Sequence, residues 1–158
     1  MKIATLRFGE LDIPEEKVIE FPKGILGFEQ FQKYIILQHE ESEPFRWMQS
    51  IEDPNLAFVI TNPANFFPNY KIEMHLRELN EIEVTEESNV ETYVIVTIPE
   101  DISQMSANLQ GPLLINTDSG LGKQVVFVNS RYTIRHYIMD ELKKRSSKNR
   151  REPLALQI

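Results

Sequence analysis

Short apolar runs separated by turn-forming residues make up most of this chain. The clearest run is 91–98, and similar runs occupy 34–38 and 56–60, while Phe45–Ser50 alternates between apolar and polar positions. Runs of this length, rich in β-branched and aromatic residues and bounded by Pro, Gly, Asn and Asp, are typical of β-strands. No helix-length periodic segment precedes the C-terminal region, and no internal repeat is present. The pattern predicts about nine short strands in an all-β fold, a small antiparallel β-barrel-like domain or a sandwich.

The segment 106–128 carries the strongest hairpin signal. Leu113–Ile115 and Val125–Val128 are apolar, and the residues from Asn116 to Gly122 between them favour turns. Gly111-Pro112 stands where a strand would begin, because proline cannot donate to a sheet ladder. The Gly-Lys pair at 122–123 lacks the earlier glycine and the following Ser or Thr of a phosphate-binding loop. The segment therefore predicts two hairpin arms joined by a long turn.

Three further segments have weaker signals. We expect Gly9–Asp12 to turn the chain after a first strand, Lys71–Met74 to form a strand, and His75–Asn80 to form a helical turn. Residues 131–137 could form a last strand, but Ile134, Ile138 and Leu142 also fit a helical period, so the boundary between strand and helix stays open. We expect one domain over 1–145 and a basic, flexible tail over 146–158.

Composition narrows the class of protein. The chain has 158 residues, 41% of them hydrophobic, and no cysteine, which fits one globular domain without disulfides. It contains no apolar run long enough to cross a bilayer and no N-terminal signal peptide. These features predict a cytoplasmic protein that does not associate with a membrane.

Charge is distributed unevenly along the chain. Residues 1–139 carry 21 acidic and 11 basic side chains, a net charge of −10, whereas residues 140–158 carry 3 acidic and 6 basic ones. An acidic body repels nucleic acid, whose binding rests on Lys and Arg, and suits a basic protein partner. Alternatively, the acidity only aids solubility.

Two surface segments are candidate binding elements. The loop 62–70 holds Phe66, Phe67 and Tyr70 among prolines and asparagines; these aromatic residues either plug an open barrel end or contact a partner. Between Glu78 and Glu91 lie six glutamates and no Lys or Arg. Such a run usually marks a solvated face.

The sequence offers no catalytic or metal-binding constellation. The three histidines, His39, His75 and His136, are scattered, without further ligands at metal-binding spacing. No nucleophile elbow is present. We therefore expect a binding protein rather than an enzyme, with no cofactor and no metal; an enzyme that hydrolyses carbohydrate with a glutamate pair ranks far behind.

Several short motifs together resemble one family. The segments Phe21–Phe28, Met48–Ser50 and Ala107–Pro112, followed by Asn116 and Gly122–Gln124, resemble the flagellar assembly factor FliW in order and spacing along nearly the whole chain. The C-terminal basic extension is longer than the family needs, so no function is transferred to it.

The resemblance implies a small, non-enzymatic β-barrel-like protein with two protein partners. One is flagellin, and the other is CsrA, a basic dimeric RNA-binding protein that represses flagellin translation. The family antagonises CsrA, and newly made flagellin competes for the assembly factor. The protein alone is expected to be a monomer that binds no nucleic acid directly.

Candidate partner-binding residues come from the loop, the glutamate run and the family motifs. They are Phe66, Phe67, Tyr70, Glu78, Glu81, Glu83, Glu86, Glu87, Asn108 and Gln124. Asn108, Asn116 and Gln124 could equally satisfy buried backbone groups at the barrel rim. A rival interpretation is an OB-like barrel that binds RNA or DNA through the basic tail and the aromatic loop.

Overall fold

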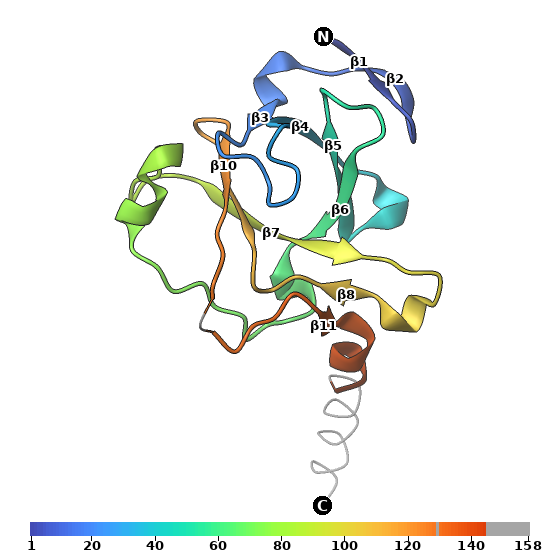
Figure 1. Cartoon of the computed structure of the whole chain (residues 1–158), viewed down its shortest axis with the longest axis vertical. Helices are drawn as coiled ribbons and strands as arrows, with labels where there is room; N and C mark the ends of the chain where they lie inside the picture. The colour runs from blue at the N-terminus through green and yellow to red at the C-terminus, as the bar shows by residue number, and fades with distance from the viewer. Residues whose placement is uncertain (129, 145–158) are drawn as a thin grey trace, which may run out of the picture.

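A closed β-barrel forms the centre of the molecule in a computed structural model, which describes residues 1–128 and 130–144 (Figure 1). The barrel strands are β3 (Ile19–Glu20), β4 (Lys33–Leu37), β5 (Phe45–Ser50), β6 (Ala57–Thr61), β7 (Val90–Thr97), β9 (Leu113–Asn116) and β10 (Leu121–Gln124). Each strand pairs with the next in the order β3-β4-β5-β6-β7-β9-β10, and β10 pairs with β3 to close the ring. The prediction of an all-β, barrel-like domain is confirmed.

The barrel is antiparallel with one exception among the described strands. β10 runs parallel to β3, which it meets at Leu121 and Glu20. β7 is long enough to serve several neighbours: Val90–Tyr93 pairs with β9, and Val94–Val96 pairs with β6. Val96 pairs with both Val59 of β6 and Ala107 of β8 (Ser106–Ala107), so β6 lies along one edge of β7 while β8 and β9 share the other.

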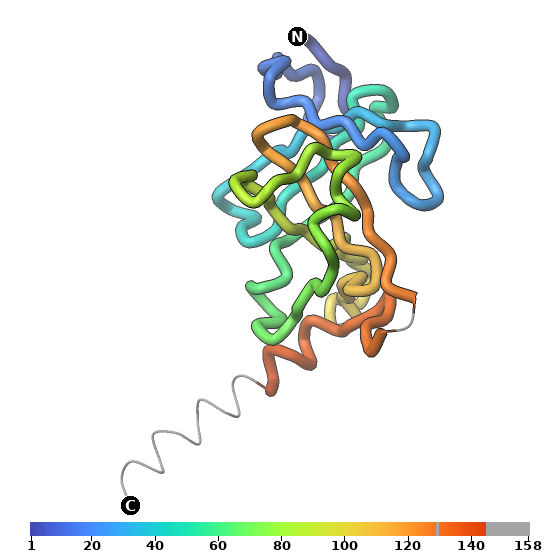
Figure 2. Tube along the Cα trace, turned by 90° about the vertical axis from the view of Figure 1, so that its left-hand side faces the viewer, coloured from blue at the N-terminus to red at the C-terminus, as the bar shows by residue number. Residues whose placement is uncertain are grey.

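The remaining elements cover the barrel's ends and sides. β1 (Lys2–Thr5) and β2 (Gly9–Asp12) form a separate hairpin at the N-terminal end, and β8 (Ser106–Ala107) and β11 (His136–Tyr137) extend the sheet from β7 at the other end (Figures 1 and 2). A short helix over residues 138–144 follows β11. The short 3-10 helices are η1 (Glu15–Lys17), η2 (Glu40–Ser42), η3 (Pro63–Asn65), η4 (Leu76–Ile82) and η5 (Ile102–Gln104).

Alternation along β9 shows why its residues are all buried. Leu113 and Ile115 point into the barrel core, whereas Leu114 points outward and packs under η4 against Leu79 and Ile82. Because successive side chains of a strand face opposite sides, a strand buried on both faces needs a cover. η4 provides that cover.

The predicted hairpin at 106–128 is correct in its first arm and wrong in its second. β9 begins directly after Pro112, as predicted, but it pairs with Leu121–Gln124 rather than with Val125–Val128. The turn is therefore only 117–120, and Gly120 takes the positive φ of 73° that it requires. Residues beyond Gln124 leave regular pairing, although Val125 still donates its amide to Pro112 O.

Two weaker expectations need correction, and one boundary that the sequence left open is now defined. Gly9–Asp12 is strand β2 and not merely a turn, since it pairs along its length with β1. The segment 71–74 has no strand, and its apolar residues Ile72 and Met74 pack instead against the cluster under η4. Within 131–137, only β11 forms a strand, and the helix starts at Ile138, whose side chain is fully buried.

The expected helical turn at 75–80 is present as η4, shifted to Leu76–Ile82. The predicted tail at 146–158 lies outside the described residues. The expected domain boundary at 145 stays a prediction.

Candidate functional site

The aromatic loop 62–70 folds inward. Phe66 and Phe67 are 7% and 6% exposed and join a core cluster with Val94 and Ile138. Tyr70 is half-buried, and its hydroxyl donates to Leu109 O at 2.7 Å. Burial raises the pKa of Tyr70. Val94 follows Tyr93, which belongs to the barrel core, so this second cluster lies on the opposite, outer face of β7 and the rings pack there rather than inside the barrel.

The glutamate run divides into a paired part and a free part. Glu81 lies 3.0 Å from both the Lys23 and the Lys123 ammonium groups, and the hydrogen bonds from these two lysines lower the pKa of Glu81. Glu78 accepts the backbone amide of His75 at the start of η4. Both carboxylates line a surface groove of about 510 Å³ beside Gln124.

Three further glutamates of the run, Glu83, Glu86 and Glu87, lie at the end of η4 and just beyond it. Glu83 ends η4 in the left-handed region at φ 61°. Glu86 and Glu87 follow in an exposed turn. Among the described residues, none of the three carboxylates has an ion pair or hydrogen bond, so their charge is available to the solvent or to a partner.

Asn108 and Gln124 fasten two loops to the barrel rim. Asn108 Oδ1 accepts the amides of Gln110 and Gly111. Gln124 Nε2 donates to Gly111 O at 3.1 Å, and its Oε1 accepts the Leu26 amide at 2.8 Å. These contacts explain why amide side chains stand at these positions: each side chain satisfies backbone groups that no strand pairs.

The loop that is hydrogen-bonded to Gln124 also exposes an apolar residue to the solvent. Leu26 is 70% exposed, while its neighbour Ile25 is buried. Gly24 and Gly27, with positive φ of 69° and 89°, shape this loop. Sequence patterning marked the two glycines but could not show which apolar residue points outward.

The Met48–Ser50 motif likewise has a structural role. Gln49 is fully buried, and its Nε2 donates to Ser50 O and Leu56 O. Ser50 Oγ accepts the amides of Glu52 and Asp53. The motif thus fixes the turn between β5 and β6.

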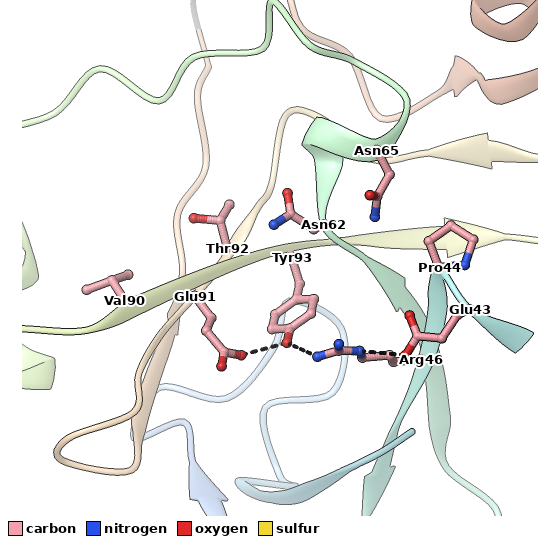
Figure 3. A pocket seen from close by; sticks show the side chains of 9 residues that line it. All are labelled: Glu43, Pro44, Arg46, Asn62, Asn65, Val90, Glu91, Thr92 and Tyr93. Atoms are coloured by element: carbon pink, nitrogen blue, oxygen red, sulfur yellow. Dashed lines mark hydrogen bonds and ion pairs between the residues drawn. The ribbon is translucent and has the colours of Figure 1, made fainter. Parts of the chain in front are cut away.

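A polar network crosses the mouth of the barrel (Figure 3). Tyr93 on β7 donates its hydroxyl to Glu91 Oε2 at 2.6 Å and accepts from Arg46 Nη1 at 3.0 Å. Arg46 on β5 also contacts Glu43 Oε1 at 3.3 Å. Burial, aided by the Glu91 carboxylate, raises the pKa of Tyr93 to about 12.

This network separates two hollows. One, of about 380 Å³, is polar and is bounded by Asn62 and Asn65 as well as the network residues. The other, of about 540 Å³, lies between the network, β4 and the segment after β2. The sequence showed alternation along β5 but gave no sign that Arg46 meets Tyr93, 47 positions away.

The second acidic block, Glu40, Glu41 and Glu43, surrounds η2 beside this mouth. Glu43 is engaged by Arg46, whereas Glu40 and Glu41 are exposed. No group of acidic and histidine side chains within the described residues is arranged to hold a metal ion. In the same part of the chain, no helix is long and apolar enough to span a bilayer.

Comparison with known proteins gives a consistent result along the whole chain. The family model described as FliW protein matches residues 2–138. A flagellar assembly factor FliW from Alkaliphilus metalliredigens is 40% identical over 157 residues, which is 98% of this chain and 97% of the relative. The corresponding protein from Natranaerobius thermophilus is 41% identical, over 89% of this chain and 94% of the relative.

A solved structure agrees with these sequence matches. A crystal structure of the flagellar assembly factor FliW superposes with a TM-score of 0.80 at 37% identity, covering 87% of this chain and 96% of that one. Likeness at this level in both sequence and fold, over nearly full lengths, shows common descent. The chain belongs to the FliW family.

Proposed function

We propose that this protein is a flagellar assembly factor that works, without catalysis, as a switch between two protein partners in the cytoplasm. One partner is a CsrA-like basic RNA-binding dimer that represses flagellin translation, and the other is flagellin. Binding to this protein relieves the repression, and flagellin reverses the relief by occupying the protein. The observation that carries the proposal is the near-full-length likeness to relatives named as flagellar assembly factors.

The surface supports a basic partner. The body of the protein carries a net charge of −10 over residues 1–139, and the exposed Glu83, Glu86 and Glu87 have no cation beside them among the described residues. Opposite charges on two proteins speed their encounter and reject wrong partners. The apolar contact that retains a partner needs an exposed, rigidly held side chain, and Leu26 has both properties.

The candidate contacts change accordingly. Glu83, Glu86 and Glu87 remain proposed as steering charges, and Glu78, Glu81 and Gln124 are proposed as one wall of a contact groove. Asn108 acts on it indirectly, through the loop it fastens. Phe66, Phe67 and Tyr70 are proposed only as support, since a partner would have to open their core cluster to reach the two buried phenylalanine rings.

The nucleic-acid alternative has less support. Its stacking platform was the aromatic loop, and the Phe66 and Phe67 rings are inside the protein. Stacking with bases needs an exposed aromatic face. Its basic tail lies outside the described residues.

A competition experiment tests the switch. The purified protein, a purified CsrA-like dimer and purified flagellin are mixed in pairs and then together, and the complexes are separated by size. We expect this protein to form a complex with each of the two partners, and added flagellin to release the CsrA-like dimer, because mutually exclusive partners compete for the same protein. Stable ternary complexes without release, or failure of either pair to form, would overturn the proposal. Labelled RNA added to this protein alone should not shift at moderate salt.

A further inference from the structure

One strand of the barrel has an edge that its neighbour leaves uncovered. β3 pairs with β4 only at Lys33 and Tyr34, whereas β4 continues to Leu37. On its other edge, β4 is paired with β5 as far as Leu37. The last part of β4 therefore has a strand on one side only.

Hydrogen-bond parity shows which backbone groups face the uncovered side. Ile51 donates its amide to Lys33 O, so Lys33 faces β5, and in an antiparallel pair this direction recurs at every second residue. Ile35 and Leu37 thus also face β5, while Ile36 and Gln38 face away from it. Among the described residues, β3 pairs with β4 no further than Tyr34, and the hydrogen bonds outside the strand ladders include none to the backbone of Ile36 or Gln38.

A groove lies along this edge. It is the hollow of about 540 Å³, and its walls include Leu11 from β2, Val18 from the segment after β2, Ile36 and Leu37 from β4, and Ile115 from β9. These apolar side chains form part of the walls, and charged residues such as Glu16 and Glu91 form the rest. An extended chain lying in it would place alternate side chains against these walls while its backbone met the β4 edge.

The charges around the groove favour a basic occupant. Asp12 is paired with the N-terminal ammonium group, and Arg46 is paired with Glu43. The carboxylates left over are Glu16, which is exposed, and Glu91, which accepts a hydrogen bond from Tyr93 but contacts no cation in the described residues. Lys17 is the one further cation in the lining.

We propose that this groove binds an extended peptide segment of a partner protein, with alternating apolar and Lys or Arg residues, as a strand added to the free edge of β4. Main-chain hydrogen bonds to Ile36 and Gln38 supply register, and the apolar walls select alternate side chains. Glu16 and Glu91 select for positive charge. A helix could not use this edge, since its own backbone groups are already paired. The proposal does not depend on which proteins the partners are.

The probe is a short synthetic peptide of alternating Val and Lys, titrated into the full-length protein while backbone amide resonances are followed by NMR. We expect the resonances of Ile36 and Gln38 to shift most. Two matched peptides act as controls: one with Glu in place of Lys, and one with N-methyl groups on the backbone amides that would face β4. Loss of those hydrogen bonds should weaken binding about tenfold.

Protein variants distinguish backbone hydrogen bonding at the β4 edge from non-specific electrostatic attraction of the peptide. Gln38→Pro removes an edge N–H at an exposed position where proline is tolerated, whereas Gln38→Ala keeps it; only the former should weaken binding. Glu16→Lys should weaken binding, and Glu100→Lys, the same charge change at an exposed residue outside the lining, should not.

Several outcomes would overturn the proposal. They are the absence of any shift at millimolar peptide, shifts centred away from β4, equal binding of the N-methylated peptide, and equal effects of the two Gln38 variants. If the Ile36 and Gln38 resonances instead move with protein concentration alone, the edge pairs with a second copy of the chain. That result would also reject a partner peptide as its occupant.

Discussion

Gly122 on β10 lies directly against the ring of Phe21: a Cβ at position 122 would come within 2.7 Å of Phe21 Cζ. The Phe21 ring is fully buried in the barrel core. Glycine is needed here for the close approach of a backbone to an aromatic ring, not for a positive φ. This contact joins two motifs of the family that are about a hundred positions apart in the chain.

We expect Gly122→Ala to lower the free energy of unfolding by about 1–3 kcal/mol, because a well-packed core cannot accept an added methyl group without strain. Denaturant unfolding measures the change. In a Phe21→Leu background the smaller side chain leaves room, so the same substitution should cost less there. Equal costs in the two backgrounds would show that the ring is not the cause.

Asn116 provides a second test of a family motif. Its side chain is buried, with Nδ2 donating to Ile82 O at 2.9 Å and Oδ1 accepting the Asp118 amide at 3.0 Å. Asn116→Asp replaces this buried donor by a carboxylate oxygen facing the Ile82 carbonyl, which keeps only the Ser119 hydroxyl as a donor, so we expect a loss of about 1–3 kcal/mol in the free energy of unfolding. Asn55→Asp, the same change at an exposed turn residue, is the control. A similar loss in both variants would contradict this role for Asn116.

The docking of the C-terminal helix should depend on pH. His136 Nε2 accepts the Thr133 amide at 2.9 Å, and desolvation by burial lowers the pKa of His136 from its ordinary value of 6.5, against a smaller opposite effect of Glu141. The unfolded chain then holds the proton more tightly than the folded one. Stability contributed by this group is therefore present above the ordinary pKa and is lost as pH falls below it.

Thermal unfolding, measured at pH values above and below the ordinary pKa of 6.5 for histidine, tests this pH dependence. The wild-type protein should lose more stability on acidification than His136→Gln, which keeps an acceptor but cannot titrate near neutrality. His39→Gln is the control, since His39 is an exposed histidine far from β11 in sequence. Identical pH profiles for the wild-type protein and His136→Gln would contradict the prediction.

Charge steering is expected to come mainly from the unpaired glutamates. Replacing Glu83, Glu86 and Glu87 together by Gln should slow association with a CsrA-like basic dimer and flatten its dependence on salt. The matched block Glu40, Glu41 and Glu43 should have a smaller effect, because Glu43 is already engaged by Arg46. Association rates at two salt concentrations decide between them. Association rates that do not depend on salt concentration, or that equal the wild-type rate in both triple variants, would show that the acidity serves solubility only.

The amino-acid sequence alone determined the strands whose residues favour extended backbone on their own. The runs that became β4, β5, β6 and β7 were identified because β-branched and aromatic residues between turn formers favour extended backbone whatever lies beside them. The first hairpin arm was found for the same reason, since Pro112 ends the preceding segment and Gly120 permits the turn. The family motifs can also be recognised from the sequence, because they consist of particular residue types at fixed spacing.

Tertiary structure decided what those signals meant. Whether Phe66 and Phe67 face solvent depends on Val94 and Ile138 closing over them, and whether Gln124 binds a partner or a loop depends on Leu26, 98 positions away. The second hairpin arm was misplaced because Leu121–Gln124 has little apolar character of its own and becomes a strand by pairing with β9 and β3. The free edge of β4 follows from where β3 begins. Such features arise from contacts between distant residues, and local propensity carries no information about which distant segments will meet.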